Sequence, residues 1–350
     1  MVDPGPLRYA VIEVTNRCNL RCAHCASSSG RARDDELSLA EIVGLLDELA
    51  DLGGEEVTII GGEALLRPDW LDICGAVVDR AMRLVLVTNG LPLVGNEAAL
   101  IALRDIGPHI IGISIDGATP ESYQALRGVD RLDDIVGLCH RLVSDGHPRV
   151  NAITTFCHAN LDQLDGFVAL LDGTSINWQF QIASRGGERF DASQFLSVSD
   201  YGRLAEAMRD LFVEKGDTLR LCPMDDFGYF PLDPALRFLH ETWAGCIAGV
   251  ELVGIRSNGD VLGCLSLADD FVEANLRQRS LGEIWRAPES FANLRHKERS
   301  LTGHCARCPH GSQCQAGCSA MAYSATGSLG CNPYCIRYLE TQQILDEVAH

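Results

Sequence analysis

The sequence is short of positive charge and has no long apolar run. It contains 29 lysine and arginine residues against 48 aspartate and glutamate residues, which gives a formal net charge of -19. A surface of this sign does not attract a phosphate backbone, so nucleic acid is not expected among the partners. No stretch of about 18 consecutive apolar residues is available to span a bilayer.

The amino terminus also lacks the pattern of a secretory signal. Residues 1–8 contain no basic region followed by an apolar core, so we expect a cytoplasmic protein without a membrane partner. Thiols stay reduced in that compartment, and the fifteen cysteines are then available for metal binding or catalysis. The length of 350 residues predicts two domains, and 46% hydrophobic residues provide ample material for a core.

Three cysteines near the amino terminus form the first motif. Cys18, Cys22 and Cys25 are separated by three and two residues, a spacing at which three thiolates can bind three corners of a cubic iron-sulfur cluster. No fourth cysteine follows nearby, so one iron would stay open to a substrate or cofactor. A zinc site, a disulfide pair and buried thiols are the alternatives. Zinc would need a fourth ligand, for which His24 is the nearby candidate.

Apolar runs alternate with helical patterns along the first half of the chain. This alternation implies right-handed crossovers and a parallel sheet. The sequence therefore predicts an α/β fold with a partial (β/α)6 TIM-like barrel, whose chemistry gathers at the carboxyl ends of the strands. The expected strands are Tyr9–Val14, Val57–Ile60, Leu84–Val87, Ile110–Ile115, Val150–Phe156 and Trp178–Ile182. The expected helices lie between Ser38 and Gly53 and over residues 70–82, 97–104, 132–143, 161–171 and 200–212.

Polar residues follow the second and the fourth of these strands. Gly61 and Gly62 would let the backbone approach a ligand closely, and Glu63 would supply charge for an ammonium group. An ordinary turn is the alternative for this tripeptide. Ser114 and Asp116 share one face of the fourth strand because side chains alternate along a strand, although an acid at a strand end can also cap a turn.

Three further polar residues leave alternatives open. Gln179 and Gln181 share a face of the sixth strand. They could line the cofactor pocket, meet the substrate or satisfy polar groups of the barrel. Arg127 could bind a carboxylate, or it could lie at a solvated helix end.

The cysteine spacing resembles that of the radical S-adenosylmethionine (radical SAM) superfamily, whose C-x3-C-x2-C motif it reproduces. The resemblance implies that the open iron chelates the methionine part of S-adenosylmethionine. It also implies that an electron from the cluster yields a 5'-deoxyadenosyl radical. The Gly-Gly-Glu tripeptide would recognise the cofactor's amino group, although Ala64 stands where relatives more often have proline. The cofactor-binding residues expected on this basis are Gly61, Gly62, Glu63, Ser114, Asp116 and His24.

A second group of eight cysteines lies between residues 246 and 335. Eight cysteines suffice for two clusters, and two zinc ribbons are the alternative. Zinc cannot supply the electrons that a neighbouring radical enzyme needs. The Asn258-Gly259 turn between apolar runs predicts a hairpin that brings Cys264 beside Cys246. Three cysteines outside both groups are expected to be buried, inert thiols: Cys74, Cys139 and Cys157.

The spacing C-x12-G-x4-C, then C-x2-C-x5-C-x3-C and a late cysteine, resembles the SPASM domain that follows the barrel in many radical SAM enzymes. The resemblance implies two interleaved ligand sets. The first auxiliary cluster would be bound by Cys246, Cys264 and Cys318. The second would be bound by Cys305, Cys308, Cys314 and Cys335. Cys331 is the alternative to Cys335, and the first cluster would have either Cys222 as a distant fourth ligand or an open iron.

The expected domains are a radical SAM partial barrel over residues 8–215, a bridge over 216–240, a small cysteine-rich α+β SPASM domain over 241–340, and a helix or tail over 341–350. Within the bridge, Asp225, Asp226 and Tyr229 could act as a base or hydrogen donor, or they could simply pack a linker. No catalytic residue is assigned from the sequence.

The combined resemblance implies an enzyme that abstracts hydrogen from a peptide, leading to a crosslink, an epimerisation or an oxidation. A small-molecule substrate (a sugar, nucleoside or amino acid) is the alternative, and a non-catalytic iron-sulfur electron carrier is the third hypothesis. The expected cofactors are S-adenosylmethionine, the radical SAM [4Fe-4S] cluster and two auxiliary [4Fe-4S] clusters. A reducing partner such as flavodoxin or ferredoxin is expected. Because the barrel begins near residue 8, a precursor peptide would be recruited by a separate protein or by the barrel itself.

Overall fold

One ten-stranded sheet organises the molecule. The computed structural model describes residues 4–240 and 243–349, so the expected boundary at residue 241 and the terminal residue 350 lie outside the described residues. The strand order is β10-β9-β8-β1-β2-β3-β4-β5-β6-β7, and each pair of neighbours from β1 to β7 is parallel. These seven strands are Tyr9–Glu13, Glu56–Ile60, Arg83–Thr88, Ile110–Ser114, Val150–Phe156, Asn177–Ile182 and Arg220–Pro223.

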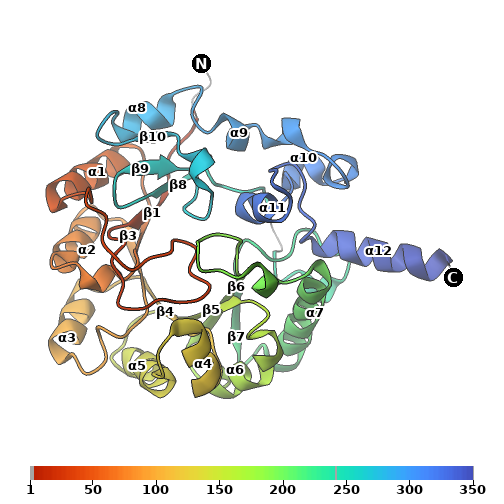
Figure 1. The fold of residues 1–350 in the computed structure, drawn as a ribbon, viewed down its shortest axis with the longest axis horizontal. Coiled ribbons are helices and arrows are strands. Elements are labelled where there is room, and N and C mark those ends of the chain that lie inside the picture. Colours follow the sequence, from red (N-terminus) through yellow and green to blue (C-terminus); the bar gives the residue numbers. More distant parts are fainter. Residues whose placement is uncertain (1–3, 241–242, 350) are drawn as a thin grey trace.

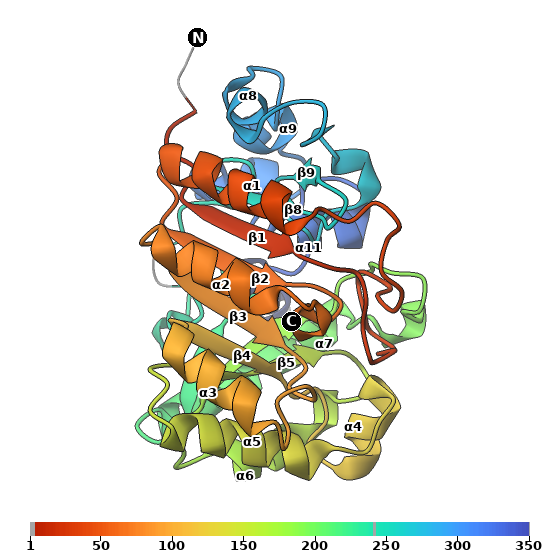
Figure 2. The same ribbon diagram turned by 90° about the vertical axis from the view of Figure 1, so that its left-hand side faces the viewer.

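Helices follow the parallel strands and cover the outside of the curved sheet (Figure 1). Helices α1, α2 and α3 lie over the first strands in Figure 2. The barrel helices α1 to α7 are Leu39–Asp51, Trp70–Asp79, Glu97–Ile106, Pro120–Arg127, Leu132–Ser144, Leu164–Leu171 and Val198–Lys215. The six predicted strands and six predicted helices are therefore confirmed within a few residues, and α4 is an addition to them.

The barrel is longer than the sequence indicated. A seventh parallel strand, β7, pairs with β6 inside the segment that was expected to be a bridge. The six predicted strand-helix units are present, and β7 is an addition to them. The strand is four residues long and only partly buried, so it lacks the apolar run that identified the other strands.

Local signals explain where the first helix begins. Ser38 accepts a hydrogen bond from the backbone N–H of Glu41, and the Glu41 carboxylate accepts one from the backbone N–H of Ser38. This reciprocal capping satisfies two backbone donors that a helix start leaves free. The buried face of α1 consists of Ile42, Leu45, Leu46 and Leu49, as the helical spacing predicted.

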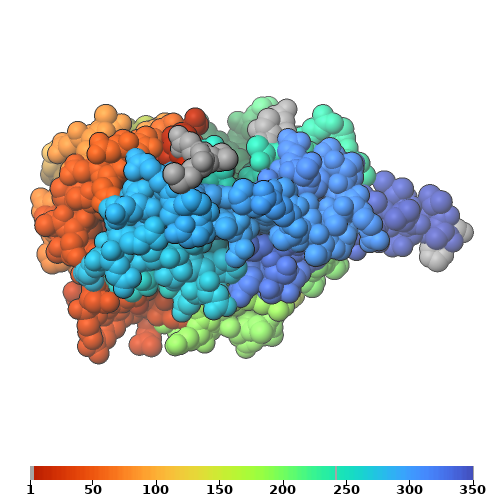
Figure 3. All heavy atoms as spheres, turned by 90° about the horizontal axis from the view of Figure 1, so that it is seen from above, coloured from red at the N-terminus to blue at the C-terminus, as the bar shows by residue number. Residues whose placement is uncertain are grey.

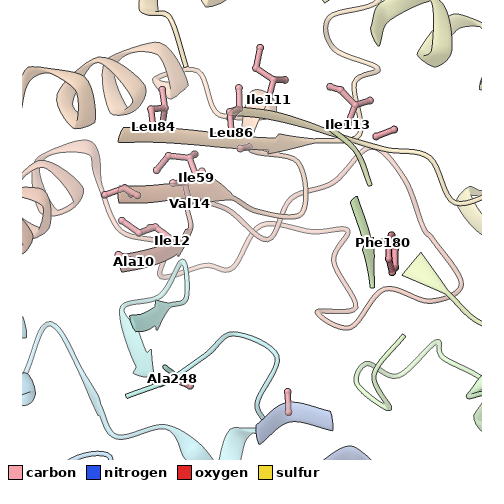
Figure 4. Close-up of a cluster of buried hydrophobic side chains, with 14 of the residues drawn as sticks. Ala10, Ile12, Val14, Ile59, Leu84, Leu86, Ile111, Ile113, Phe180 and Ala248 are labelled. Atoms are coloured by element: carbon pink, nitrogen blue, oxygen red, sulfur yellow. The ribbon is translucent and has the colours of Figure 1, made fainter. Parts of the chain in front are cut away.

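The core lies between the sheet and these helices. Alternate residues of strands β1 to β6 are buried, for example Ala10 and Ile12 on β1 and Leu84 and Leu86 on β3, because successive side chains point to opposite faces. Figure 4 shows these residues with Ile59, Ile111 and Ile113 from the neighbouring strands. On the second face, which lines the barrel, Tyr9 and Val11 of β1 and Thr58 and Ile60 of β2 are half-buried.

The cysteine-rich domain continues the barrel's sheet. Strand β8 (Leu252–Ile255) pairs in parallel with β1, and β9 (Asp260–Leu262) and β10 (Ala274–Asn275) follow it in antiparallel order. The predicted Asn258-Gly259 hairpin is thus confirmed. Figure 3 shows this domain as a blue and cyan surface against the red and orange start of the barrel. Its helices α8 to α12 are Leu281–Arg286, Ala292–Arg295, Gly311–Cys314, Ser319–Thr326 and Ile336–Ala349.

Two smaller findings complete the architecture. Helix α12 begins at Ile336, before the expected boundary at 341, and it projects from the molecule in Figure 1. Among residues 4–240 and 243–349, no helix combines the length and apolar character needed to cross a membrane.

Candidate iron-sulfur and cofactor sites

The loop after β1 brings three thiols together. Backbone N–H groups of Leu20 and Ser29 point at the sulfur atoms of Cys18 and Cys25, each at 3.4 Å. A negative charge on Cys25 contributes to raising the pKa of both the Cys18 thiol and the Cys22 thiol. Burial raises the pKa of Cys22 to about 11, so the thiol must lose its proton when a metal binds. Three converging sulfurs with N–H donors aimed at two of them fit an iron-sulfur cluster.

Gly61 and Gly62 pack against the backbone that leads into this loop. The backbone N–H of Gly62 donates to Thr15 O at 2.7 Å, and that of Glu63 donates to Arg17 O at 2.8 Å. A Cβ atom on Gly62 would lie 2.5 Å from Arg17 O, and one on Gly61 would lie 2.7 Å from Thr15 O. The glycines were expected to allow close approach to a ligand. In the structure they allow close approach to the backbone that leads into Cys18.

The Glu63 carboxylate joins the ends of two strands. It is 1% exposed and accepts hydrogen bonds from the Thr88 hydroxyl at 2.7 Å, Asn89 N–H at 2.7 Å and Leu65 N–H at 3.2 Å. Burial raises the pKa of Glu63, and the hydrogen bonds from Thr88 and Asn89 oppose this. The Asn89 amide in turn donates to Asn19 at 2.7 Å. The expected ammonium-binding acid is therefore tied to the cysteine loop by protein partners.

Asp116 is the centre of a buried charge network. Its Oδ2 lies 3.1 Å from His24 Nε2 and 2.9 Å from an Arg127 nitrogen, and its Oδ1 accepts from Thr155 N–H at 2.8 Å. Burial alone would raise the pKa of Asp116, but His24 and Arg127 outweigh it and bring the pKa to about 2. Arg127 is the last residue of α4 and is 7% exposed. The interpretation of Arg127 as a solvated helix end, one of the alternatives that the sequence left open, is therefore wrong.

Three polar atoms around this network are buried without a hydrogen-bond partner among the described residues: His24 Nδ1, Arg127 Nε and the Tyr123 hydroxyl. Buried polar atoms are normally paired. Their position beside the cysteine loop fits a site that receives a polar ligand such as S-adenosylmethionine.

The other polar residues at this end of the barrel divide into two kinds. Ser114 ends β4 half-buried, and no hydrogen bond of its hydroxyl connects it to another described residue. Gln179 accepts from the Asn151 amide at 2.9 Å, and Gln181 donates to the Thr155 hydroxyl at 3.0 Å. Of the alternatives that the sequence left open for the two glutamines, these contacts favour satisfaction of barrel polar groups.

The loop of residues 185–189 acts as a clamp that holds the cysteine loop in place, a role that the sequence did not predict. Arg189 donates to the backbone carbonyls of Cys22, Ser28 and Ser29 at 3.3, 3.0 and 2.9 Å. A Cβ atom on Gly187 would lie 2.1 Å from Cys25 O. The two loops lie side by side in the centre of Figure 1, dark red and green. The available signal was its place after the sixth strand, at the edge where the cysteine loop also lies.

The same loop reaches the cysteine-rich domain. The backbone N–H of Arg185 donates to the Ser324 hydroxyl on α11 at 2.6 Å. Helix α11 directly follows Cys318. Residues 185–189 therefore connect the loop of the first motif to an element that carries an expected auxiliary ligand.

Cys246, Cys264 and Cys318 gather in one place. Burial raises the pKa of Cys318, and the charges of Cys246 and Cys264 add to it. Burial also raises the pKa of Cys264, and the charge of Asp225 adds to this increase. Cys222 lies on β7 opposite Gln179, and the charge that acts on it comes from Arg149. Among the described residues, these three sulfurs fit the ligand set expected for a first auxiliary cluster, and nothing in this geometry favours Cys222 as the fourth ligand.

Five thiols surround the second auxiliary site. Burial raises the pKa of Cys335 to about 12, with further contributions from Cys314, Cys305 and Cys308. Cys331 also lies here, since its sulfur, the Cys305 sulfur and His304 Nδ1 are all within 4.8 Å of one another. Soft thiolates in such numbers fit an iron-sulfur cluster. Away from both groups, Cys74, Cys139 and Cys157 are fully buried, as predicted.

The glycine contact yields a stability prediction. Gly62→Ala forces a Cβ atom against the Arg17 carbonyl, and we expect the free energy of unfolding to fall by roughly 1–3 kcal/mol. The iron content should fall with it, because residues 15–17 position Cys18. Gly75→Ala is the control: Gly75 lies within α2 and has open space around it, so unfolding in urea should be unchanged or shift upward by up to about 1 kcal/mol. Equal stability of Gly62→Ala and wild type would contradict this account.

The clamp yields a second prediction. Arg189→Ala removes three hydrogen bonds to the cysteine loop, and we expect iron bound per chain to fall by up to about four while helix content is retained in circular dichroism. Arg80→Ala is the matched control, because Arg80 donates to the Ala76 and Val43 carbonyls and contacts no residue of the thiol loop. A full iron complement in Arg189→Ala would show that the clamp does not hold the loop.

Comparisons with known proteins agree with this geometry. The radical SAM superfamily matches residues 12–171, and SPASM, an iron-sulfur cluster-binding domain, matches residues 246–309. The mycofactocin maturase MftC of Mycolicibacterium smegmatis is 30% identical over 340 residues, covering 93% of this chain and 81% of its own. The AdoMet-dependent heme synthase of Methanosarcina barkeri is 30% identical over 347 residues, covering 94% of this chain and 96% of its own.

Solved structures show the same fold. Streptococcus suis SuiB bound to S-adenosylmethionine superposes with a TM-score of 0.74 at 19% identity, covering 95% of this chain and 76% of that chain. The chain therefore belongs to the radical SAM superfamily and carries a SPASM domain, and it is an enzyme that uses S-adenosylmethionine and [4Fe-4S] clusters.

Proposed function

We propose that this enzyme modifies a peptide by hydrogen abstraction. The observation that carries the radical chemistry is the thiol loop after β1, supported by Gly61, Gly62 and Glu63 and joined through one sheet to two further groups of cysteines. When bound, the open cluster supplies the electron that cleaves S-adenosylmethionine to the 5'-deoxyadenosyl radical. The peptide substrate is supported by the maturase relative. SuiB, which shares the fold, has been solved with its precursor peptide SuiA.

We assign the cluster ligands of the barrel to Cys18, Cys22 and Cys25. Ser114, whose hydroxyl has no hydrogen bond to a described residue, is the direct cofactor contact. Gly61, Gly62, Glu63, Asp116 and His24 act at the same site mainly by holding other groups in place. The pKa of Asp116 near 2 keeps that carboxylate ionised at neutral pH, so it can hold His24 and Arg127 in fixed positions.

A small-molecule substrate is the second candidate. The specific observation in its favour is the heme synthase relative, which has nearly the same length as this chain. The two candidates differ in what stimulates cleavage of S-adenosylmethionine. A short peptide encoded next to the gene should increase deoxyadenosine release and gain a mass change in the first case, and it should do neither in the second.

A reducing partner and a reducing compartment complete the proposal. The radical reaction needs one electron for each cleavage, for which flavodoxin or ferredoxin is the proposed donor. All fifteen cysteines are free thiols, which supports a cytoplasmic location. A separate peptide-recognition protein is the proposed recruiter of a precursor.

Counting iron tests the function directly. Anaerobically reconstituted wild-type protein should contain about twelve irons per chain and release deoxyadenosine when reduced. The Cys18/Cys22/Cys25 triple alanine variant should contain about eight irons and release none. Zinc in place of iron, or intact S-adenosylmethionine after reduction of the wild type, would refute the proposal.

The late cysteines provide a second test. We propose Cys335 as the fourth ligand of the second auxiliary cluster. Its thiol lies close enough to Cys305, Cys308 and Cys314 for the charges of all three to raise its pKa. Cys335→Ser should lose about four irons, whereas Cys331→Ser should retain them. Loss of iron from Cys331→Ser alone would transfer the assignment to Cys331, whose sulfur lies 3.5 Å from His304 Nδ1.

A further inference from the structure

The chain contains two lysines, Lys215 and Lys297. Lys215 is a half-exposed residue that pairs with Asp172 at 2.7 Å. Lys297 begins a short 3-10 turn after α9 and is 1% exposed. No described carboxylate forms an ion pair with Lys297. A fully buried ammonium group without an ionic partner is costly, so its retention inside the cysteine-rich domain requires an explanation.

The hydrogen bonds of Lys297 place it between the two auxiliary sites. Its Nζ donates to Gly317 O at 2.8 Å and to the Ser319 hydroxyl at 3.0 Å. These two residues flank Cys318, and Gly317 N–H donates to Cys314 O at 3.1 Å. The segment from Cys314 to Cys318 carries one proposed ligand of each auxiliary cluster. The ammonium group is therefore fixed at the one peptide stretch that the two sites share.

The charges around Lys297 also place it between the two auxiliary sites. Burial lowers the pKa of Lys297, while Cys246, Cys318, Cys314 and Cys305 raise it. Cys246 and Cys318 belong to the ligand set of the first auxiliary cluster, and Cys314 and Cys305 belong to that of the second. An ammonium group has three N–H donors, and two of them are bound to Gly317 and Ser319. The third has no acceptor among the described residues.

We propose that Lys297 is a shared counter-charge for the two auxiliary clusters and holds both reduction potentials up. The proposal rests on the function and ligand sets proposed above. Thiolate-bound clusters are anionic and become more so on reduction, so a fixed positive charge nearby stabilises the reduced form. The compact ammonium group suits this position better than the planar guanidinium that the chain uses as its other cation.

Two variants separate charge from hydrogen bonding. Lys297→Met removes both, whereas Lys297→Gln removes the charge and keeps N–H donors for Gly317 and Ser319. Each is made in the Cys18/Cys22/Cys25 triple alanine background, so that the auxiliary clusters alone give the spectroscopic signal. Lys215→Met is the control for loss of a lysine charge at a distant surface.

Midpoint potentials are then measured by redox titration followed by electron paramagnetic resonance. We expect both auxiliary potentials to shift to more negative values in Lys297→Met and in Lys297→Gln, and to stay unchanged in Lys215→Met. Unshifted potentials in Lys297→Gln would overturn the proposal, as would an equal shift in Lys215→Met.

A second measurement applies if the variants do not retain auxiliary iron. Without clusters the buried ammonium group has no counter-charge, so metal-free Lys297→Met should unfold at the same temperature as metal-free wild type or at a higher one. A lower unfolding temperature would indicate a structural role and overturn the proposal. Absence of any iron-sulfur signal in the wild type would instead refute the proposed function. If the wild type releases deoxyadenosine and the variants keep their auxiliary iron, unshifted potentials in the variants would refute the role of Lys297 alone.

Discussion

Strand β1 is the constraint on which the arrangement depends. It pairs in parallel with β2 of the barrel on one side and with β8 of the SPASM domain on the other. The Glu13 carboxylate at its end accepts from the Ser257 hydroxyl at 2.9 Å and also pairs with Arg33. The loop with the three thiols follows this same strand. Because β1 pairs with a strand of each domain, the barrel mouth and the auxiliary domain share one continuous sheet, and backbone hydrogen bonds set the spacing between the thiol loop and the auxiliary cysteines.

Buried charges at this end of the barrel act mainly on one another. The pKa of Asp116, lowered to about 2, corresponds to about 2 kcal/mol in favour of the ionised form, so the attraction of His24 and Arg127 exceeds the cost of burial. Glu63 shows the opposite balance, because burial outweighs its three hydrogen bonds. The pKa values of two carboxyl groups with similar burial therefore shift in opposite directions, because Asp116 contacts His24 and Arg127 whereas Glu63 contacts neutral hydrogen-bond donors.

The sequence predicted the strand and helix alternation because each buried strand is a short apolar run and each helix has one apolar face. It also predicted the grouping of cysteines, because spacing limits which thiols can meet. It did not predict β7, whose four residues are partly exposed, or the burial of Arg127, which depends on its ion pair with Asp116. The union of β1 with β8 was also out of reach, since pairing between residues some 240 positions apart leaves no local pattern.

The residues of the Gly-Gly-Glu motif show why a motif can identify chemistry and still mislead about contacts. The absence of side chains at Gly61 and Gly62 is needed because carbonyl groups of Thr15 and Arg17 occupy the space that a Cβ atom would take. On the opposite side of the loop, the carbonyl of Cys25 likewise occupies the space that a Cβ atom on Gly187 would take. The thiol loop is thus held between two glycine-bearing backbones, and thiols held this way need little reorganisation when a metal binds. Preorganisation of the ligands by backbone contacts, rather than by their own side chains, explains why residues without side chains are required on both sides of the loop.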